Sequence, residues 1–189
     1  MLLPHIETER LVLRMYHPKE LETVYQLLSD EDVTRFYPPG YTITREEVLA
    51  GMPRRLERWR NQGFGQLGVF AIGSGNLIGY CGLQYFDQTP EVEIYYGFFK
   101  NAWGRGLATE SARAMLRFGF EKTKLDKIAA GTHPDNFASQ KVLQKIGLEK
   151  HLQLKRFYNI DSVYFSILRK DYQPDERAKY VLSYTEIND

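Results

Sequence analysis

Cysteine is nearly absent from this 189-residue chain, whose single example is Cys81. One cysteine forms neither an intramolecular disulfide nor a multi-cysteine metal site, which is typical of a reducing compartment. The residues around Cys81 predict a strand, in which a lone cysteine usually fills the core. No apolar run approaches the roughly 18 residues of a membrane span, and no secretion leader is evident. We therefore expect a cytoplasmic protein that does not enter a membrane.

An excess of charge of one sign is also missing. The chain has 25 Lys and Arg residues against 24 Asp and Glu residues, so its net charge is +1. Without a strong overall field we expect no nucleic-acid partner, and any electrostatic steering must be local. The histidines have no metal-ligand spacing, which predicts no metal site. They are His5, His17, His133 and His151.

Internal repeats and low-complexity linkers are missing as well. The length fits one domain that buries about 70% of its unfolded surface. We place this domain at residues 1–172 and a polar C-terminal tail at residues 173–189, and the sequence does not indicate where the tail packs. A monomer and a homodimer are both compatible with this organisation.

The chain does contain a strand, a glycine-rich turn and a helix in succession. Residues 91–99 are rich in β-branched and aromatic types, the composition of a strand packed on both faces. Gly104 and Gly106 follow, and the apolar residues after them keep helical spacing. Such a turn aims backbone N–H groups and the positive helix end at one point, where they can hold a phosphate. The alternative is that the glycines only permit the turn.

Two familiar nucleotide loops do not fit this segment. A Walker loop needs four residues between its glycines and a Lys-Ser/Thr ending, and a Rossmann loop needs a third glycine where Thr109 stands. The segment instead resembles the GNAT superfamily of acetyl-coenzyme A dependent N-acetyltransferases, whose pattern Gln/Arg-x-x-Gly-x-Gly/Ala starts here with Asn101. Residues 93–96 and 103–110 are similar to the RimJ/RimL ribosomal-protein acetyltransferase branch. The resemblance extends over about residues 5–172.

A second segment resembles the same family. Residues 136–148 are similar to its Asn-x-x-Ser/Ala-x-x-Val/Leu-x-x-Lys-x-Gly-Phe helix, whose first positions meet the pantetheine arm of the coenzyme. Asn136 and Ser139 lie three apart and share a helix face, although Asn136 also suits a helix N-cap. The resemblance implies that acetyl-coenzyme A is held by Phe98, Phe99, Trp103, Gly104, Arg105, Gly106, Leu107, Ala108, Thr109, Asn136 and Ser139.

The fold class expected is α/β, or α+β by some schemes. The helical crossover from residues 91–99 to a strand at 127–132 implies parallel pairing, whereas strands near 149–158 and 161–169 are close enough to pair antiparallel. The resemblance implies a GNAT fold, with a mixed, mostly antiparallel twisted sheet, a splayed central parallel pair and flanking helices.

Earlier elements follow from local patterns. Alternation predicts a first strand around residues 11–15, and Pro18 suits the first turn of a helix that runs through Leu28. Residues 44–47 form a capping box for a second helix, which Pro53 should kink. Strands at about 66–73 and 77–86 should meet across a hairpin-like turn.

The chemistry implied is attack of an amine on a thioester. The amine must lose a proton, and the resemblance puts a carboxylate that takes it at Glu93, with Glu91 on the same strand face. A structural or substrate-orienting carboxylate is the alternative. The tyrosine that usually protonates the leaving thiolate aligns with Leu143, so Ser139 is the remaining candidate for that role.

The acceptor stays open between a protein N-terminus, a free amino acid, a polyamine and an antibiotic amine. The aromatic loop at residues 37–41 should lie over the acceptor side. Four arginines in the second helix could attract an acidic acceptor, although a solvated basic face is the favoured interpretation. They are Arg54, Arg55, Arg58 and Arg60. A non-catalytic acyl-coenzyme A binding module is the competing function.

Overall fold

The computed structural model describes residues 1–38, 41–86 and 89–187. Its strands are β1 Leu2–Glu7, β2 Leu11–Arg14, β3 Gln66–Ala71, β4 Leu77–Tyr85, β5 Val92–Phe98, β6 Lys127–Thr132, β7 Glu149–Phe157, β8 Ile160–Leu168 and β9 Val181–Glu186. Its α-helices are α1 Leu21–Ser29, α2 Glu31–Thr34, α3 Arg45–Gln62, α4 Leu107–Lys122 and α5 Phe137–Lys145. Short 3₁₀ segments are Pro18–Glu20, Lys100–Ala102 and Arg169–Asp171. None of these helices has the length and apolar character needed to cross a membrane.

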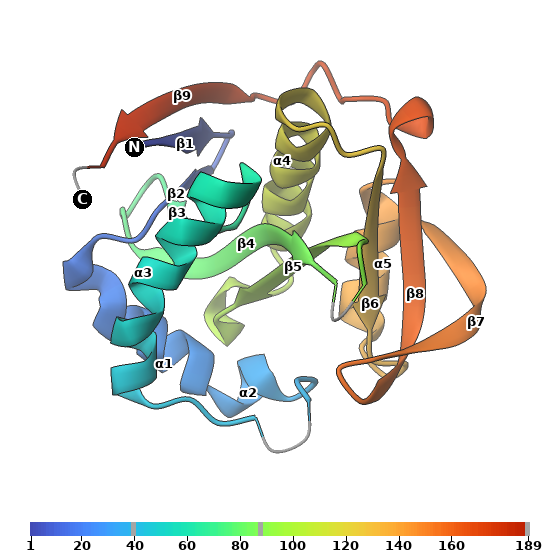
Figure 1. Cartoon of the computed structure of the whole chain (residues 1–189), viewed down its shortest axis with the longest axis horizontal. Coiled ribbons are helices and arrows are strands. Elements are labelled where there is room, and N and C mark those ends of the chain that lie inside the picture. Colours follow the sequence, from blue (N-terminus) through green and yellow to red (C-terminus); the bar gives the residue numbers. More distant parts are fainter. Residues whose placement is uncertain (39–40, 87–88, 188–189) are drawn as a thin grey trace.

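One sheet carries all the strands, in the order β7-β8-β6-β5-β4-β3-β2-β1-β9. Among the described residues, β5 and β6 form the parallel pair, and every other neighbouring pair is antiparallel. The parallel ladder is limited to the pair Glu93 and Ala129, so the two strands separate beyond it (Figure 1). This is the mixed, mostly antiparallel sheet that the sequence predicts.

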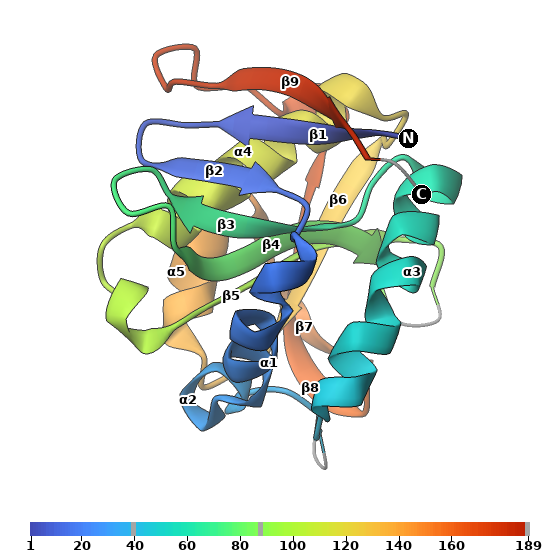
Figure 2. The ribbon, with the colours of Figure 1, turned by 90° about the vertical axis from the view of Figure 1, so that its left-hand side faces the viewer.

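Helices cover the two faces of the sheet. The α1 and α3 helices lie on one face, and α4 packs on β4 and β5 from the other, with α5 against α4 and β6 (Figure 2). At Gly119 of α4, an added Cβ would lie 2.8 Å from methyl carbons of Leu83 and Ile128. The absence of a side chain therefore lets α4 lie close to the sheet, which fixes the position of its N-terminus relative to β5.

Cys81 lies in the middle of β4 and is fully buried. Burial raises the pKa of its thiol to about 12, although a hydrogen bond with Ser111 of α4 opposes the change. The thiol is therefore protonated at neutral pH and packs in the core, as the strand pattern suggests.

The C-terminal segment is part of the sheet. The β9 strand pairs with β1 along its full length, from Leu2 with Glu186 to Glu7 with Val181. The backbones of Met1 and Ile187 exchange two further hydrogen bonds of 2.9 Å. Neither β1 nor β9 follows from the sequence, because the polar–apolar alternation of both strands is weak and β9 is the edge strand of the sheet.

Two local predictions take a more definite form in the structure. The capping box of α3 is present: Glu47 N donates to Thr44 Oγ1 (3.1 Å) and Thr44 N donates to Glu47 Oε2 (2.7 Å), and the helix continues through Pro53. The β7–β8 connection is the two-residue turn Tyr158-Asn159, whose φ angles of 50° and 62° fit a type I′ hairpin. The turn therefore comes earlier than the sequence suggests.

Candidate active site

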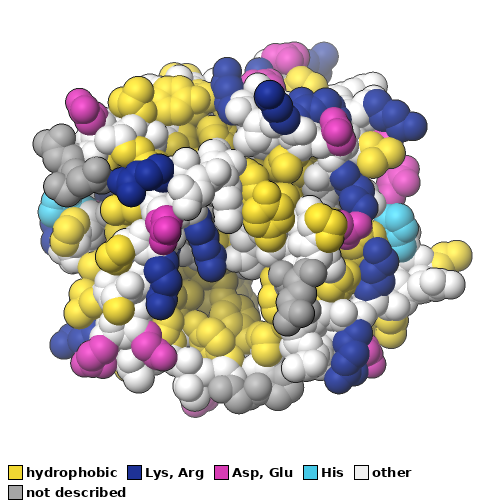
Figure 3. All heavy atoms as spheres, in the orientation of Figure 1, with side chains coloured by type: hydrophobic (Ala, Val, Ile, Leu, Met, Phe, Trp, Pro, Cys, Tyr) yellow, Lys and Arg dark blue, Asp and Glu magenta, His cyan; other side chains and the backbone are white. Residues whose placement is uncertain are grey.

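The central feature of the site is the opening between β5 and β6. Beyond Glu93, no described residue of β6 pairs with the β5 backbone. Successive β5 side chains point to opposite faces: Glu93 and Tyr95 face the α1–α3 side, and Ile94 and Tyr96 face α4 and α5. A cavity of about 680 Å³ is lined by all four of these side chains, so it passes through the sheet at the opening. Figure 3 shows its mouth as a hollow with an apolar floor.

The turn between β5 and α4 has the geometry of an anion site. Gly104 and Gly106 have φ angles of 72° and 76°, in the left-handed region that favours glycine. Gly106 is the N-cap of α4, and no side chain among the described residues caps the helix. An added Cβ would meet nothing within 4 Å at Gly104, and at Gly106 it would lie 3.6 Å from Arg10 Nη2. The turn therefore has room for a ligand, and the first N–H groups of α4, which lack intrahelical partners, suit an anion such as the pyrophosphate of a coenzyme.

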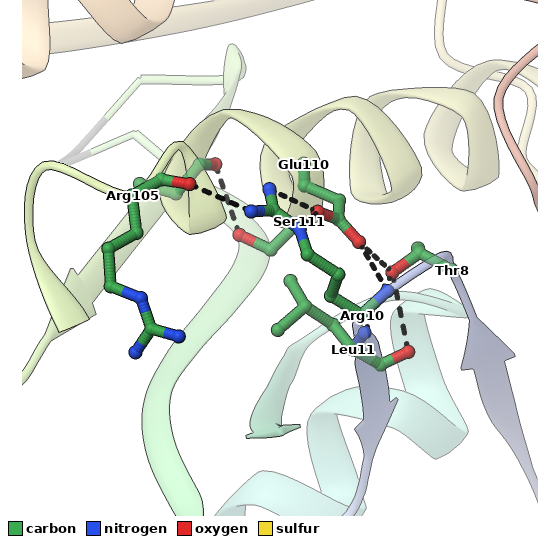
Figure 4. Close-up of polar contacts among 7 residues, drawn as sticks. Thr8, Arg10, Leu11, Arg105, Glu110 and Ser111 are labelled. Atoms are coloured by element: carbon green, nitrogen blue, oxygen red, sulfur yellow. Dashed lines mark hydrogen bonds and ion pairs between the residues drawn. The ribbon is translucent and has the colours of Figure 1, made fainter. Parts of the chain in front are cut away.

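Trp103 and the β1–β2 turn hold this glycine turn in place. Trp103 Nε1 donates to the carbonyl of Phe98 at 2.7 Å, which ties the turn to the end of β5. On the other side, the Arg10 guanidinium binds Glu110 Oε2 (2.6 and 2.7 Å) and donates to the carbonyl of Arg105 (2.9 Å) (Figure 4). Sequence reasoning missed Arg10, because its partners are about a hundred residues away along the chain.

Glu110 collects further donors from the same turn. Thr8 Oγ1 donates to Glu110 Oε1 at 2.6 Å, and the backbone N–H of Arg10 donates to the same oxygen at 2.8 Å. Thr8 is buried, whereas the Arg10 side chain is about half exposed. Glu110 also lies in the first turn of α4, where a negative charge is favourable. We refer to Thr8, Arg10 and Glu110 as the turn clamp.

Glu93 is held by two donors. It is 5% exposed, and its Oε1 accepts hydrogen bonds from Gln84 Nε2 (2.8 Å) and from the Tyr158 hydroxyl (2.7 Å). Gln84 is directly opposite Glu93 on β4, and Tyr158 comes from the β7–β8 turn. These donors orient the carboxylate. Sequence reasoning identified Glu93 but neither of its partners, since nothing local to Tyr158 indicates that it reaches β5.

Glu91 has a different environment, although it precedes β5 by one residue. It forms an ion pair with Lys127 of β6 and accepts a hydrogen bond from the Tyr164 hydroxyl of β8 at 2.7 Å. Burial alone would raise the pKa of the Glu91 carboxyl, but the Lys127 and Tyr164 hydrogen bonds hold this pKa below its ordinary value. Glu91 therefore links the start of β5 to β6 and β8. It is not among the described residues that line the cavity.

The first turn of α5 faces the opening from the other face. Asn136 Oδ1 accepts a hydrogen bond from Ser139 N at 3.1 Å, so Asn136 is the N-cap of α5. The N-cap was one of the two roles expected for this residue. The Tyr96 hydroxyl lies 3.1 Å from Ser139 Oγ and 3.2 Å from the Ser139 carbonyl oxygen. Leu143, one turn further along, lines the same cavity. Sequence reasoning did not single out Tyr96. Its phenol comes from β5 and lines the same cavity as Leu143, the position that aligns with the family's usual tyrosine.

The other residues predicted to bind the coenzyme differ in how far their side chains are exposed. Phe98 and Leu107 are buried, so their side chains pack in the core and only their backbones can reach a ligand. Trp103 is 47% exposed, and Arg105 is also exposed. Phe99 N donates to the Ile78 carbonyl at 3.1 Å, and its side chain is partly buried against the core. Ala108 and Thr109 are half-buried in the first turn of α4.

The family model described as an acetyltransferase (GNAT) domain matches residues 10–149. The chain belongs to the GNAT acetyltransferase family. It is 28% identical to the Bacillus subtilis protein named uncharacterized N-acetyltransferase YnaD, over 89% of this chain and 99% of that protein. It is 25% identical to the putative ribosomal N-acetyltransferase YdaF of the same organism, over 89% of this chain and 96% of that protein.

A solved structure supports the same assignment. The GNAT-family acetyltransferase from Bacillus anthracis superimposes with a TM-score of 0.72 at 29% identity, over 88% of this chain and 99% of that chain. GNAT acetyltransferases transfer an acetyl group from acetyl-coenzyme A to an amine, and this chain is an N-acetyltransferase of that family. In this GNAT protein the glycine turn and α5 lie on one face of the sheet, and α1 and α3 cover the other (Figures 1 and 2).

The α1–α3 face adds to the sequence interpretation. Arg54 and Arg58 of α3 are exposed, as expected for a solvated basic face, but with the half-buried Arg55 they also line the cavity. Arg60 is not among the described residues of its lining. Tyr37 and Tyr41 lie over the same cavity with their rings 4.7 Å apart, and Tyr37 forms a hydrogen bond with Tyr80. Residues 39 and 40 of the aromatic loop lie outside the described residues.

Proposed function

We propose that the protein transfers the acetyl group directly from acetyl-coenzyme A to a primary amine, with Glu93 as the general base. The observation that carries the proposal is the single cavity that joins the Glu93 carboxylate on one face of the sheet to Ser139 and Leu143 on the other. The amine reaches Glu93 from the α1–α3 side, and the coenzyme lies along the turn and the first turn of α5.

Binding of the coenzyme rests on the backbone of the glycine turn. The N–H groups at the start of α4 hold the pyrophosphate, together with Arg105 at the surface. The unpaired edge of β5 and the first turn of α5 hold the pantetheine arm, with Asn136 and Ser139 facing it. Bound there, acetyl-coenzyme A supplies an activated thioester at the opening between β5 and β6.

Glu93 removes a proton from the attacking nitrogen. An α-amine with a pKa near 8 costs only about 1.4 kcal/mol to deprotonate at pH 7, whereas a lysine-type amine near 10.4 costs about 4.6 kcal/mol. The two hydrogen bonds to Glu93 Oε1 hold the carboxylate in position at the cavity wall. A carboxylate is therefore an adequate base for an α-amine, directly or through one water.

The leaving sulfur departs on the other face of the sheet. The carbon–nitrogen bond forms as the carbon–sulfur bond breaks, and Glu93 receives the amine proton. A thiol pKa near 8.5 means that the thiolate needs little assistance. Burial raises the pKa of the Tyr96 phenol, so this group stays protonated and donates a hydrogen bond. The Ser139 hydroxyl and the Tyr96 hydroxyl therefore stabilise the sulfur in place of a tyrosine at Leu143.

Membership of the RimJ/RimL-like branch is a second part of this proposal. It is supported by residues 93–96 and 103–110 and by the similarity to the protein named putative ribosomal N-acetyltransferase YdaF. The single-domain boundary at residue 172, a cytoplasmic location and a monomeric or homodimeric state stay predictions. So do the coenzyme roles assigned to individual residues.

A coenzyme A release assay over a set of amines and N-terminal peptides tests the function. Glu93→Gln keeps the size of the side chain but removes its basicity, so we expect kcat to fall at least about 100-fold while the coenzyme dissociation constant stays unchanged. Glu91→Gln is the matched control, because Glu91 is paired with Lys127 outside the described cavity lining. Turnover by Glu93→Gln across pH 6–9 would show that Glu93 only orients. Binding without any coenzyme A release would favour the non-catalytic module.

A further inference from the structure

One face of α3 presents three arginines to the acceptor side of the cavity. Gly51, Arg54, Arg55 and Arg58 are spaced i, i+3, i+4 and i+7, so they share one side of the helix, and all four line the cavity. We refer to the three arginines as the arginine face. Figure 3 shows Lys or Arg side chains along the side of the hollow that α3 forms.

The arginine face forms no close ion pair with a described carboxylate. Other arginines form ion pairs, such as Arg14 with Glu20 and Arg45 with Glu22, but no described carboxylate lies within 4.0 Å of the arginine face. Glu47 and Glu93 are the carboxylates among the described lining residues, and Glu47 also accepts the Thr44 N–H in the capping box. The α3 wall therefore presents three guanidinium groups to the cavity without a direct partner among the described carboxylates.

Arg55 is held in place by hydrogen bonds to neutral groups and not by an ion pair. Its Nε donates to Gln66 Oε1 at 3.2 Å and its Nη1 contacts the Val48 carbonyl oxygen at 3.5 Å. Both acceptors are neutral. Room for the guanidinium comes from Gly51, where an added Cβ would lie 2.6 Å from Arg55 Nη1. The local packing therefore positions a cation at the cavity wall.

Tyr95, the arginine face and Glu93 all line the same cavity. Burial and the neighbouring Tyr16 raise the pKa of the Tyr95 phenol, Arg58 and Arg55 act in the opposite direction, and the Glu93 carboxylate raises it further. One small molecule in this cavity can therefore reach the base with its amine and the guanidinium groups with another part.

The coenzyme does not account for these arginines. Its phosphates would lie at the start of α4, on the opposite face of the sheet from α3. Among the described residues, the opening between β5 and β6 connects the two sides, and in the proposed function the acceptor enters from the α3 side. An anion at the arginine face therefore belongs to the acceptor.

We propose that the acceptor is a small amine that also carries an anionic group, a carboxylate or a phosphate, which Arg54, Arg55 and Arg58 bind while the amine reaches Glu93. This inference rests on the proposed function and names its substrate class. The size of the cavity is that of a small-molecule site. A polyamine would meet like charge on the α3 wall.

Matched ligands test the proposal by calorimetry with coenzyme A present. L-glutamate is compared with L-glutamine, and O-phosphoserine with serine, so that each pair differs by one anionic group. We expect the anionic member of at least one pair to bind about 10-fold or more tightly than its neutral partner. The pair that responds identifies the carboxylate or the phosphate as the source. Equal binding within both pairs, tighter binding of spermidine, or binding only of an acidic N-terminal peptide would overturn the proposal.

Variants assign the effect to the arginine face. Arg58→Gln should reduce the preference for the anionic ligand about 10-fold, and Arg58→Glu should abolish or reverse it. Gly51→Ala displaces the Arg55 guanidinium without changing the net charge and should also weaken the preference. Lys124→Gln, an exposed residue between α4 and β6, makes the same charge change as Arg58→Gln and should leave it unaltered. A preference that survives in all three cavity variants would contradict the assignment.

Failure of the proposed function gives a different result. If the wild-type protein releases no coenzyme A with any acceptor, the catalytic assignment fails, whereas the calorimetric comparison of charged and neutral ligands still decides the anion assignment. If coenzyme A release is fast with neutral amines and slow with anionic ones, the catalytic assignment stands and the anion assignment fails.

Discussion

Removing Glu110 should weaken coenzyme binding, although Glu110 is not expected to touch the coenzyme. Its carboxylate gathers the Thr8 hydroxyl, the Arg10 N–H and the Arg10 guanidinium, and Arg10 in turn holds the Arg105 carbonyl inside the glycine turn. Glu110→Ala removes the bonds to the carboxylate together, and the remaining bond from Arg10 to the Arg105 carbonyl loses the ion pair that orients Arg10. The start of α4 is then held less firmly to the β1–β2 turn, and we expect the N–H groups proposed to bind the pyrophosphate to become less well ordered.

The magnitude follows from the burial of the partners. Hydrogen bonds to a charged group contribute about 1.5–3 kcal/mol when buried, but the Arg10 side chain is 49% exposed, so solvent screens its share. Thr8 is buried and retains its bond to the Leu11 carbonyl at 3.3 Å, so it is not left without a partner. We therefore expect the free energy of unfolding to fall by about 1–2 kcal/mol and the coenzyme dissociation constant to rise about 10-fold.

Urea denaturation and calorimetric titration with coenzyme A measure the two effects. Glu121→Ala is the matched control, because Glu121 pairs with Arg117 at i,i+4 on the same helix but far from its N-terminus. That pair should contribute no more than about 0.5 kcal/mol and leave coenzyme affinity unchanged. Coenzyme affinity that is equal in Glu110→Ala and wild type would refute the idea that the turn clamp orders the phosphate site.

Three further outcomes are expected. Gly106→Val should raise the coenzyme dissociation constant at least about 10-fold in calorimetry, because φ is 76° there and a β-branched residue is strained in that region; unchanged affinity would remove the pyrophosphate assignment. Ser139→Ala should raise the KM for acetyl-coenzyme A with little change in kcat, whereas a selective loss of kcat in steady-state assays would make the Ser139–Tyr96 pair part of the proton path. The stability that Glu91 provides through Lys127 should be present above the ordinary carboxyl pKa and lost as pH falls through the lowered folded value, because the folded state then takes up a proton. Urea denaturation of Glu91→Gln and wild type should therefore differ at pH 7 and converge as the pH falls below the lowered pKa of the Glu91 carboxyl, and a constant difference would contradict this linkage.

Local sequence signals determined the elements that build the coenzyme side. Gly104 and Gly106 predict a turn with positive φ because other residues are strained there, and the periodic apolar residues after them predict α4. The capping box at Thr44 and Glu47 predicts the start of α3 for the same kind of reason, since its hydrogen bonds join residues three apart. Such preferences act within a few residues, so they can be recognised without the fold.

The surroundings of the site were decided by the tertiary structure alone. Tyr158 reaches Glu93 across 65 positions of the chain and Arg10 reaches Glu110 across 100, and no local pattern encodes either contact. Which side of α3 faces the cavity depends on how the helix packs, so the sequence could not distinguish a solvated basic face from the arginine face. The edge pairing of β1 with β9 likewise joins the two ends of the chain. Chain segments that are distant in sequence meet only when burial of the shared core brings them together, and that core belongs to the whole fold.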